Sequence, residues 1–131
     1  MKKVVISGSA SLQDATKKWI DYWKNYGYEI IDYPKPIKKE EVIHRYPQIH
    51  KEFYQCTEQT NVLFIMNEDK KGISGYIGAS TFAELAFAVA LNSIYNKNIE
   101  ILLLKMPSLN VQCYEEIKLW LSLGWIKLLK Q

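Results

Sequence analysis

The chain has 131 residues, of which 48% are hydrophobic and 24% are charged. This composition excludes a disordered or fibrous protein, and the length allows one domain with a core of its own. The formal net charge of +3 comes from scattered lysines and not from a concentrated basic face, so we expect no nucleic-acid partner.

The cysteines, the histidines and the apolar runs exclude further classes. Cys56 and Cys113 stand far apart with no CxxC pair, which predicts neither a zinc site nor a disulfide. His44 and His50 lack the spacing of a helical ligand pair, so we expect no metal and no cofactor. Residues 4–6 are too short for a signal peptide, and no run approaches the roughly 20 apolar residues of a membrane span. We therefore expect a cytoplasmic protein with no membrane partner.

Strand and helix patterns alternate in the first half of the chain. Residues 4–6 predict a short buried strand, residues 7–11 a loop, and residues 28–33 a second strand. The helix between the two strands carries an apolar stripe at helical spacing, made of Leu12, Ala15, Trp19 and Trp23. After a charged connector over residues 38–45, Pro47 is expected in the first turn of another helix. One face of that helix carries Ile49, Phe53 and Cys56.

The same alternation continues in the second half. Residues 62–66 are an unbroken apolar run, typical of a strand buried on both faces of a parallel sheet, and residues 67–75 are polar. The elements expected next are a helix over residues 82–95, a strand over residues 99–104 and a helix over residues 114–123. Residues 125–129 fit either a strand or a terminal helical turn.

This alternation predicts an α/β fold in which one domain, residues 1–131, holds a parallel sheet of four to five strands flanked by helices. Folds of this kind are flavodoxin- or Rossmann-like. Their ligands gather at the carboxyl ends of the strands. A ligand site is therefore expected among residues 7–11, residues 67–80 and the loop after Leu104.

The loop after the first strand is a candidate for substrate binding. Ser7, Gly8 and Ser9 stand between an apolar strand and a helix, so their hydroxyl and N–H groups could meet a phosphate or a sugar. A plain turn with a serine N-cap explains the same residues. The sequence leaves both interpretations open.

A carboxylate follows two glycines in G-Y-I-G-A-S-T-F-A-E-L-A-F-A, residues 75–88. Glu84 is expected in the first turn of a helix, where the helix dipole would keep the carboxylate ionised and available as a nucleophile. Thr81 and Glu84 also fit a capping box, in which Glu84 would only satisfy a backbone N–H. The two hypotheses differ in side-chain direction, because a cap points back at the backbone and a nucleophile points into a cleft.

The order of these parts, and residues 75–90 in particular, resembles nucleoside 2-deoxyribosyltransferases and related nucleotide N-glycoside hydrolases. The resemblance implies that Glu84 attacks the anomeric carbon of a nucleoside or nucleotide. It also implies that an aspartate before the motif protonates the departing base; Asp69 is the best match, and Glu68 is its neighbour. The substrate-binding residues expected on this basis are Ser7, Gly8, Ser9, Tyr76, Gly78, Ser80 and Thr81.

Two departures from the family pattern concern the same site. Gly78 and Ala79 stand where members of the family often have an acidic residue, a difference that bears on base recognition. The first loop also lacks the tyrosine that orients the nucleophile in some members, and Tyr76 is the candidate to replace it.

Three hypotheses about function remain at this point. The first is an enzyme that cleaves or transfers the N-glycosidic bond of a (deoxy)nucleoside or nucleoside 5′-monophosphate. The second is a non-catalytic nucleotide-binding or sensor module, since fold alone does not fix function. The third is an assembly protein in which Glu84 is only a cap. The helix over residues 82–95 is apolar nearly all round, which predicts a homodimer or a larger homo-oligomer.

Overall fold

One sheet of five parallel strands, in the order β2-β1-β3-β4-β5, organises the chain in a computed structural model that describes residues 1–131. The strands are β1 (Lys3–Ser7), β2 (Glu29–Asp32), β3 (Val62–Ile65), β4 (Glu100–Leu103) and β5 (Lys127–Leu128). The helices are α1 (Gln13–Asn25), α2 (Val42–Gln59), α3 (Ala79–Tyr95) and α4 (Tyr114–Ser122), with a short 3-10 turn, η1 (Lys39–Glu41), before α2. This strand order is that of flavodoxin-like folds, and the predicted fold class is confirmed.

The three apolar runs form the centre of the sheet, as predicted. β1 lies between β2 and β3, and β3 lies between β1 and β4. All four residues of β3 are buried, because neighbouring strands cover its edges and helices cover both of its faces. Residues 125–129, left open by the sequence, contain the short edge strand β5.

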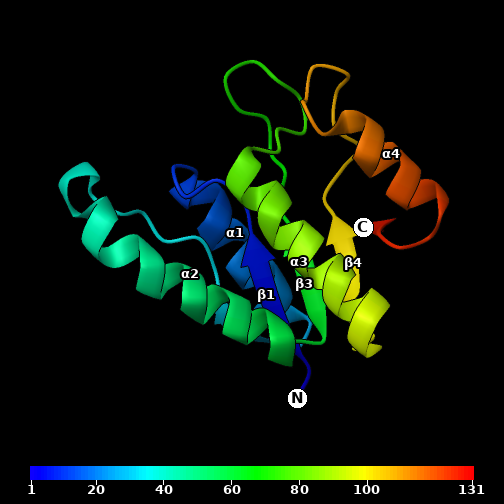
Figure 1. The fold of residues 1–131 in the computed structure, drawn as a ribbon, viewed down its shortest axis with the longest axis horizontal. Helices are drawn as coiled ribbons and strands as arrows, with labels where there is room; N and C mark the ends of the chain where they lie inside the picture. The colour runs from blue at the N-terminus through cyan, green and yellow to red at the C-terminus, as the bar shows by residue number, and fades with distance from the viewer.

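Helices cover both faces of the sheet (Figure 1). α1 lies behind the sheet in this view, and its Trp19 and Trp23 pack against Phe64 of β3 with ring centroids 4.9 Å and 5.5 Å apart. α2 and α3 cross in front of the sheet, and α4 extends this layer through Trp120, which stacks on Phe82 of α3. None of the helices is both long and apolar enough to cross a membrane.

Two helices begin earlier than the sequence predicts. α2 begins at Val42, so Pro47 lies inside the helix and not in its first turn. The helix continues through this position because the φ angle of proline is helical, although one backbone hydrogen bond is lost. α3 begins at Ala79 and not at Phe82, because Gly78 and not Thr81 occupies the N-cap position.

Candidate active site

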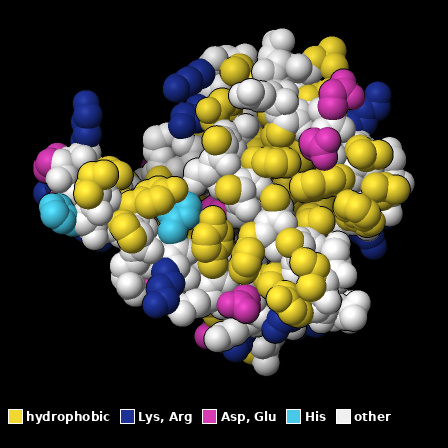
Figure 2. Space-filling model, viewed as in Figure 1, with side chains coloured by type: hydrophobic (Ala, Val, Ile, Leu, Met, Phe, Trp, Pro, Cys, Tyr) yellow, Lys and Arg dark blue, Asp and Glu magenta, His cyan; other side chains and the backbone are white.

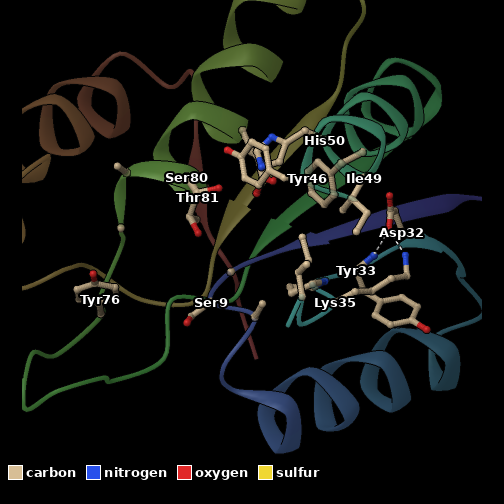
Figure 3. Close-up of a pocket in the computed structure, with 18 of the residues that line it drawn as sticks. Ser9, Asp32, Tyr33, Lys35, Tyr46, Ile49, His50, Tyr76, Ser80 and Thr81 are labelled. Atoms are coloured by element: carbon tan, nitrogen blue, oxygen red, sulfur yellow. Dashed lines mark hydrogen bonds and ion pairs between the residues drawn. The ribbon is translucent and has the colours of Figure 1, made fainter. Parts of the chain in front are cut away.

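A cleft of about 400 Å³ opens at the carboxyl ends of β1 and β2. Its floor comes from the loops after these strands, and its walls come from α2 and the first turns of α3 (Figure 3). The volume lies in the usual range for small-molecule sites. The expected site residues that line it are Gly8, Ser9, Tyr76, Gly78, Ser80, Thr81 and Glu84.

Glu84 lies in the second turn of α3 and lines this cleft. Its Oε1 accepts a hydrogen bond from the hydroxyl of Ser7 at 2.5 Å, and no cap interaction joins it to the start of the helix. The capping-box hypothesis is therefore wrong, because Thr81 is already the third residue of the helix. Ser7 is fully buried and lies behind the cleft, where it holds Glu84 and does not line the ligand space.

The environment of Glu84 favours its neutral form. Burial raises the pKa of this carboxyl to about 7, the Ser7 hydroxyl opposes the shift, and the negative charge of Asp32 adds to it. Burial therefore opposes the ionised form of Glu84 that the sequence predicts. A carboxyl with this pKa is divided between both forms at neutral pH, which suits a group that reacts in a cleft.

The loop after β1 approaches the third strand closely. A Cβ on Gly8 would come within 2.6 Å of Met66 Cγ, so a larger residue would displace that side chain. The hydroxyl of Ser9 lies 2.9 Å from the hydroxyl of Ser11 and accepts a hydrogen bond of 2.6 Å from Lys70 Nζ. α1 has Leu12 at its N-cap position with no side-chain cap, so the serine N-cap interpretation is wrong.

The start of α3 presents free amides next to Lys70. The first hydrogen bond of the helix runs from the Phe82 N–H to the Gly78 carbonyl at 3.0 Å, which leaves the three preceding N–H groups for solvent or a ligand. Tyr76 lies over Gly78, where a Cβ would come within 3.3 Å of its ring. Lys70 Nζ lies 5.4 Å from the centroid of that ring. Together with Ser9, this corner offers hydrogen-bond donors and a positive charge.

An aromatic series on α2 was missed in the sequence, and two of its rings, Tyr46 and His50, line the cleft. The rings of Tyr46 and His50 lie 3.9 Å apart at an angle of 30°, and Tyr54 meets His50 edge-on at 5.6 Å. Tyr54 then contacts Phe87 of α3, with centroids 4.8 Å apart. Burial lowers the pKa of His50, and burial followed by the charge of Glu84 raises the pKa of Tyr54. The i, i+4 spacing of these rings was visible in the sequence.

Asp32 at the end of β2 also lines the cleft and was also missed. Its side chain is 8% exposed, and its Oδ1 accepts from the Tyr33 N–H at 2.8 Å and from Lys35 Nζ at 2.6 Å, as Figure 3 shows. The rule that ligands gather at the carboxyl ends of parallel strands applies to β2 as much as to β1. Applied there, it would have singled out Asp32.

Asp69 does not share the cleft with Glu84. Its side chain is 61% exposed, and its Oδ1 accepts from the Gly75 N–H at 3.0 Å and from Lys105 Nζ at 2.8 Å. The hydrogen bond from Lys105, followed by that from Gly75, lowers the pKa of Asp69, which is the wrong direction for an acid. Glu68 is also engaged, since its Oε2 accepts from Trp19 Nε1 at 2.8 Å.

No group of three or more histidine, cysteine, aspartate or glutamate side chains is arranged to hold a metal ion. Comparisons with models of protein families, with curated proteins and with solved structures find no match to this chain.

Proposed function

We propose that the protein cleaves or transfers the N-glycosidic bond of a (deoxy)nucleoside or nucleoside 5′-monophosphate, with Glu84 as the nucleophile. The observation that carries the proposal is the direction of Glu84, which lines the cleft, accepts a hydrogen bond from Ser7 behind it, and makes no cap interaction with the start of its helix. The resemblance over residues 75–90 implies that the same carboxylate attacks the anomeric carbon. We also propose that this reaction takes place in the cytoplasm.

In this mechanism the ionised form of Glu84 attacks the anomeric carbon. The attack passes through an oxocarbenium-like state to a glycosyl ester, while the base departs. The Ser7 hydroxyl donates to one carboxylate oxygen and so orients the other toward the sugar. Ser7 therefore takes the orienting role for which the sequence offered Tyr76. Water then resolves the ester in a hydrolase, and a second base does so in a transferase.

Two parts of the cleft suit the two ends of such a substrate. Ser9, Lys70 and the free amides at the start of α3 suit a 5′-phosphate or the sugar hydroxyl at that position. The ring of Tyr46, which lines the cleft beside His50, offers an aromatic surface against which a base can pack.

A non-catalytic nucleotide-binding or sensor module is the second candidate. The position of Asp69 favours this candidate, because the acid implied by the resemblance lies outside the cleft and is paired with Lys105. A module of this kind would bind the same ligands and release no base.

We also propose a homodimer or larger homo-oligomer that buries the outer face of α3. Glu84 is the only charged residue of this helix, and Ala83, Ala90 and Ile94 are exposed on it. Figure 2 shows hydrophobic side chains gathered over α3 and toward α4 on this side of the molecule. Exposed apolar patches of this kind are typical of subunit contacts.

Measuring the release of free base tests the proposal. The protein is incubated with a panel of deoxynucleosides, ribonucleosides and their 5′-monophosphates, with and without a second free base, and chromatography measures base released or exchanged. We expect release or exchange for one class of substrate. Binding of a nucleotide without release of any base would favour the binding module.

A further inference from the structure

We infer that His50 is the general acid that donates a proton to the departing base. This inference rests on the proposed function. His50 lines the same cleft as Glu84, from the helix next to the one that carries the nucleophile (Figure 3). Histidine is the side chain best suited to exchange a proton near neutral pH.

Neighbouring rings hold the His50 ring in place, but its nitrogen atoms form no hydrogen bond with another residue. Tyr46 stacks on one side of it at 3.9 Å, and Tyr54 meets it edge-on at 5.6 Å. Ring stacking restricts the side chain without occupying its nitrogen atoms. The structure contains no hydrogen bond from His50 to another residue, so both nitrogens remain available to a ligand in the cleft.

Three other charged groups in or near the cleft are already engaged. Asp69 lies outside the cleft and pairs with Lys105. Asp32 is already engaged, since its Oδ1 accepts from Lys35 and from a backbone N–H. Lys70 donates to Ser9 at the corner that suits the 5′ end of the substrate.

His50 and Glu84 can then supply every proton transfer and bond change that the reaction needs within the cleft. A Glu84 oxygen forms a bond to the anomeric carbon, the electron pair of the C–N bond moves to the base, and protonated His50 gives its proton to that base. His50 is then neutral. In hydrolysis it removes a proton from the water that attacks the anomeric carbon, and Glu84 departs as a carboxylate. In transfer, the incoming base takes the place of water.

The pH profile gives a second readout for this role. On its own helix, Tyr46 and Tyr54 contact the His50 ring. The other titratable and charged groups that line the cleft are Glu84 on α3, Lys70 and Tyr76 in the loop after β3, and Asp32, Tyr33 and Lys35 at and after the end of β2. The active form carries one proton, on His50, while Glu84 is ionised. Because the pKa of Glu84 is about 7 and burial lowers that of His50, loss of this proton should lower kcat/KM above about pH 7.

His50→Gln tests the inference, with His44→Gln as the matched control because His44 is exposed on the same helix outside the cleft. Each variant is assayed on the best nucleoside substrate and on the 4-nitrophenyl glycoside of the same sugar, whose leaving group departs without a proton. We expect His50→Gln to lower kcat/KM on the nucleoside by roughly 10²–10⁴ and to leave the nitrophenyl substrate within about threefold. Its residual activity should rise with pH through about 7 and then level off.

Equal losses on both substrates, or a fall in activity above pH 7 that persists in His50→Gln, would overturn the assignment of His50. If base release is normal in His50→Gln and absent in Glu84→Gln, the proposed function stands and only His50 is wrong. If the wild-type protein releases base from no nucleoside or nucleotide, the proposed function and this inference fall together.

Discussion

The hydroxyl of Ser7, at the end of β1, donates a hydrogen bond of 2.5 Å to Oε1 of Glu84, in the second turn of α3. This contact joins a fully buried serine to a carboxylate that lines the cleft. It explains why Glu84 points away from the start of its own helix. It also supports the ionised form of a carboxyl whose surroundings otherwise favour the neutral form.

Ser7→Ala should weaken the nucleophile without removing it. The pKa of Glu84 should rise further, because the Ser7 hydroxyl lowers it in the wild-type protein. We expect kcat/KM at pH 7 to fall roughly tenfold, as for loss of a hydrogen bond to a charged group, with recovery at higher pH. Steady-state base release across pH 5–9 measures both effects. Ser11→Ala is the control because Ser11 is exposed outside the cleft; an equal loss there would refute the role of Ser7.

Glu84→Gln should make the fold more stable at alkaline pH. The pKa of Glu84 is about 7 in the folded protein and 4.5 for a free glutamate, so the wild-type protein loses stability as the pH rises from 4.5 to about 7. Above pH 7 the cost approaches about 3 kcal/mol, and glutamine, which still accepts from Ser7, avoids it. Urea unfolding at pH 5 and pH 8 should show a larger gain at pH 8. No gain at pH 8 would contradict the shifted pKa.

Asp69→Asn should change base release by less than a factor of about three, because Asp69 lies outside the cleft and an exposed ion pair contributes little. The asparagine oxygen can still accept from the Gly75 N–H. Measuring kcat/KM beside that of His50→Gln separates the two candidate acids. A loss of a hundredfold or more in Asp69→Asn would restore the role that the family resemblance implies.

The sequence predicted the sheet better than the cleft. Unbroken apolar runs identify β1, β3 and β4 because the central residues of strands buried on both faces are apolar. A local motif singled out Glu84 but left open whether its side chain caps the helix or enters the cleft. The path of the loop after β3 could not be predicted, since Asp69 turns toward Lys105, a long-range partner that no local pattern shows. His50 and Asp32 were missed for a related reason, because they join the cleft only once α2 and β2 pack beside β1 and α3.

Ala90→Glu should dissociate the proposed oligomer. Ala90 is exposed on the uncharged outer face of α3, and a carboxylate buried there in a symmetric contact would meet its own copy. Light scattering at micromolar concentration should give a larger mass for the wild-type protein than for the variant. Lys17→Glu on α1, which covers the opposite face of the sheet, is the control and should keep the wild-type mass. A monomeric wild-type protein would refute the oligomer.

The glycosyl ester on Glu84 is the most direct test of the proposed function. A 2′-fluoro-arabinosyl analogue of the best substrate slows both steps of the reaction, because fluorine destabilises the oxocarbenium-like state. After incubation, peptide mass spectrometry should find the fluorinated sugar on the peptide that contains Glu84, accompanied by an equal amount of free base, and Glu84→Gln should carry no sugar. Release of base with no sugar on Glu84, or a sugar attached to another residue, would contradict the assignment of Glu84 as the nucleophile.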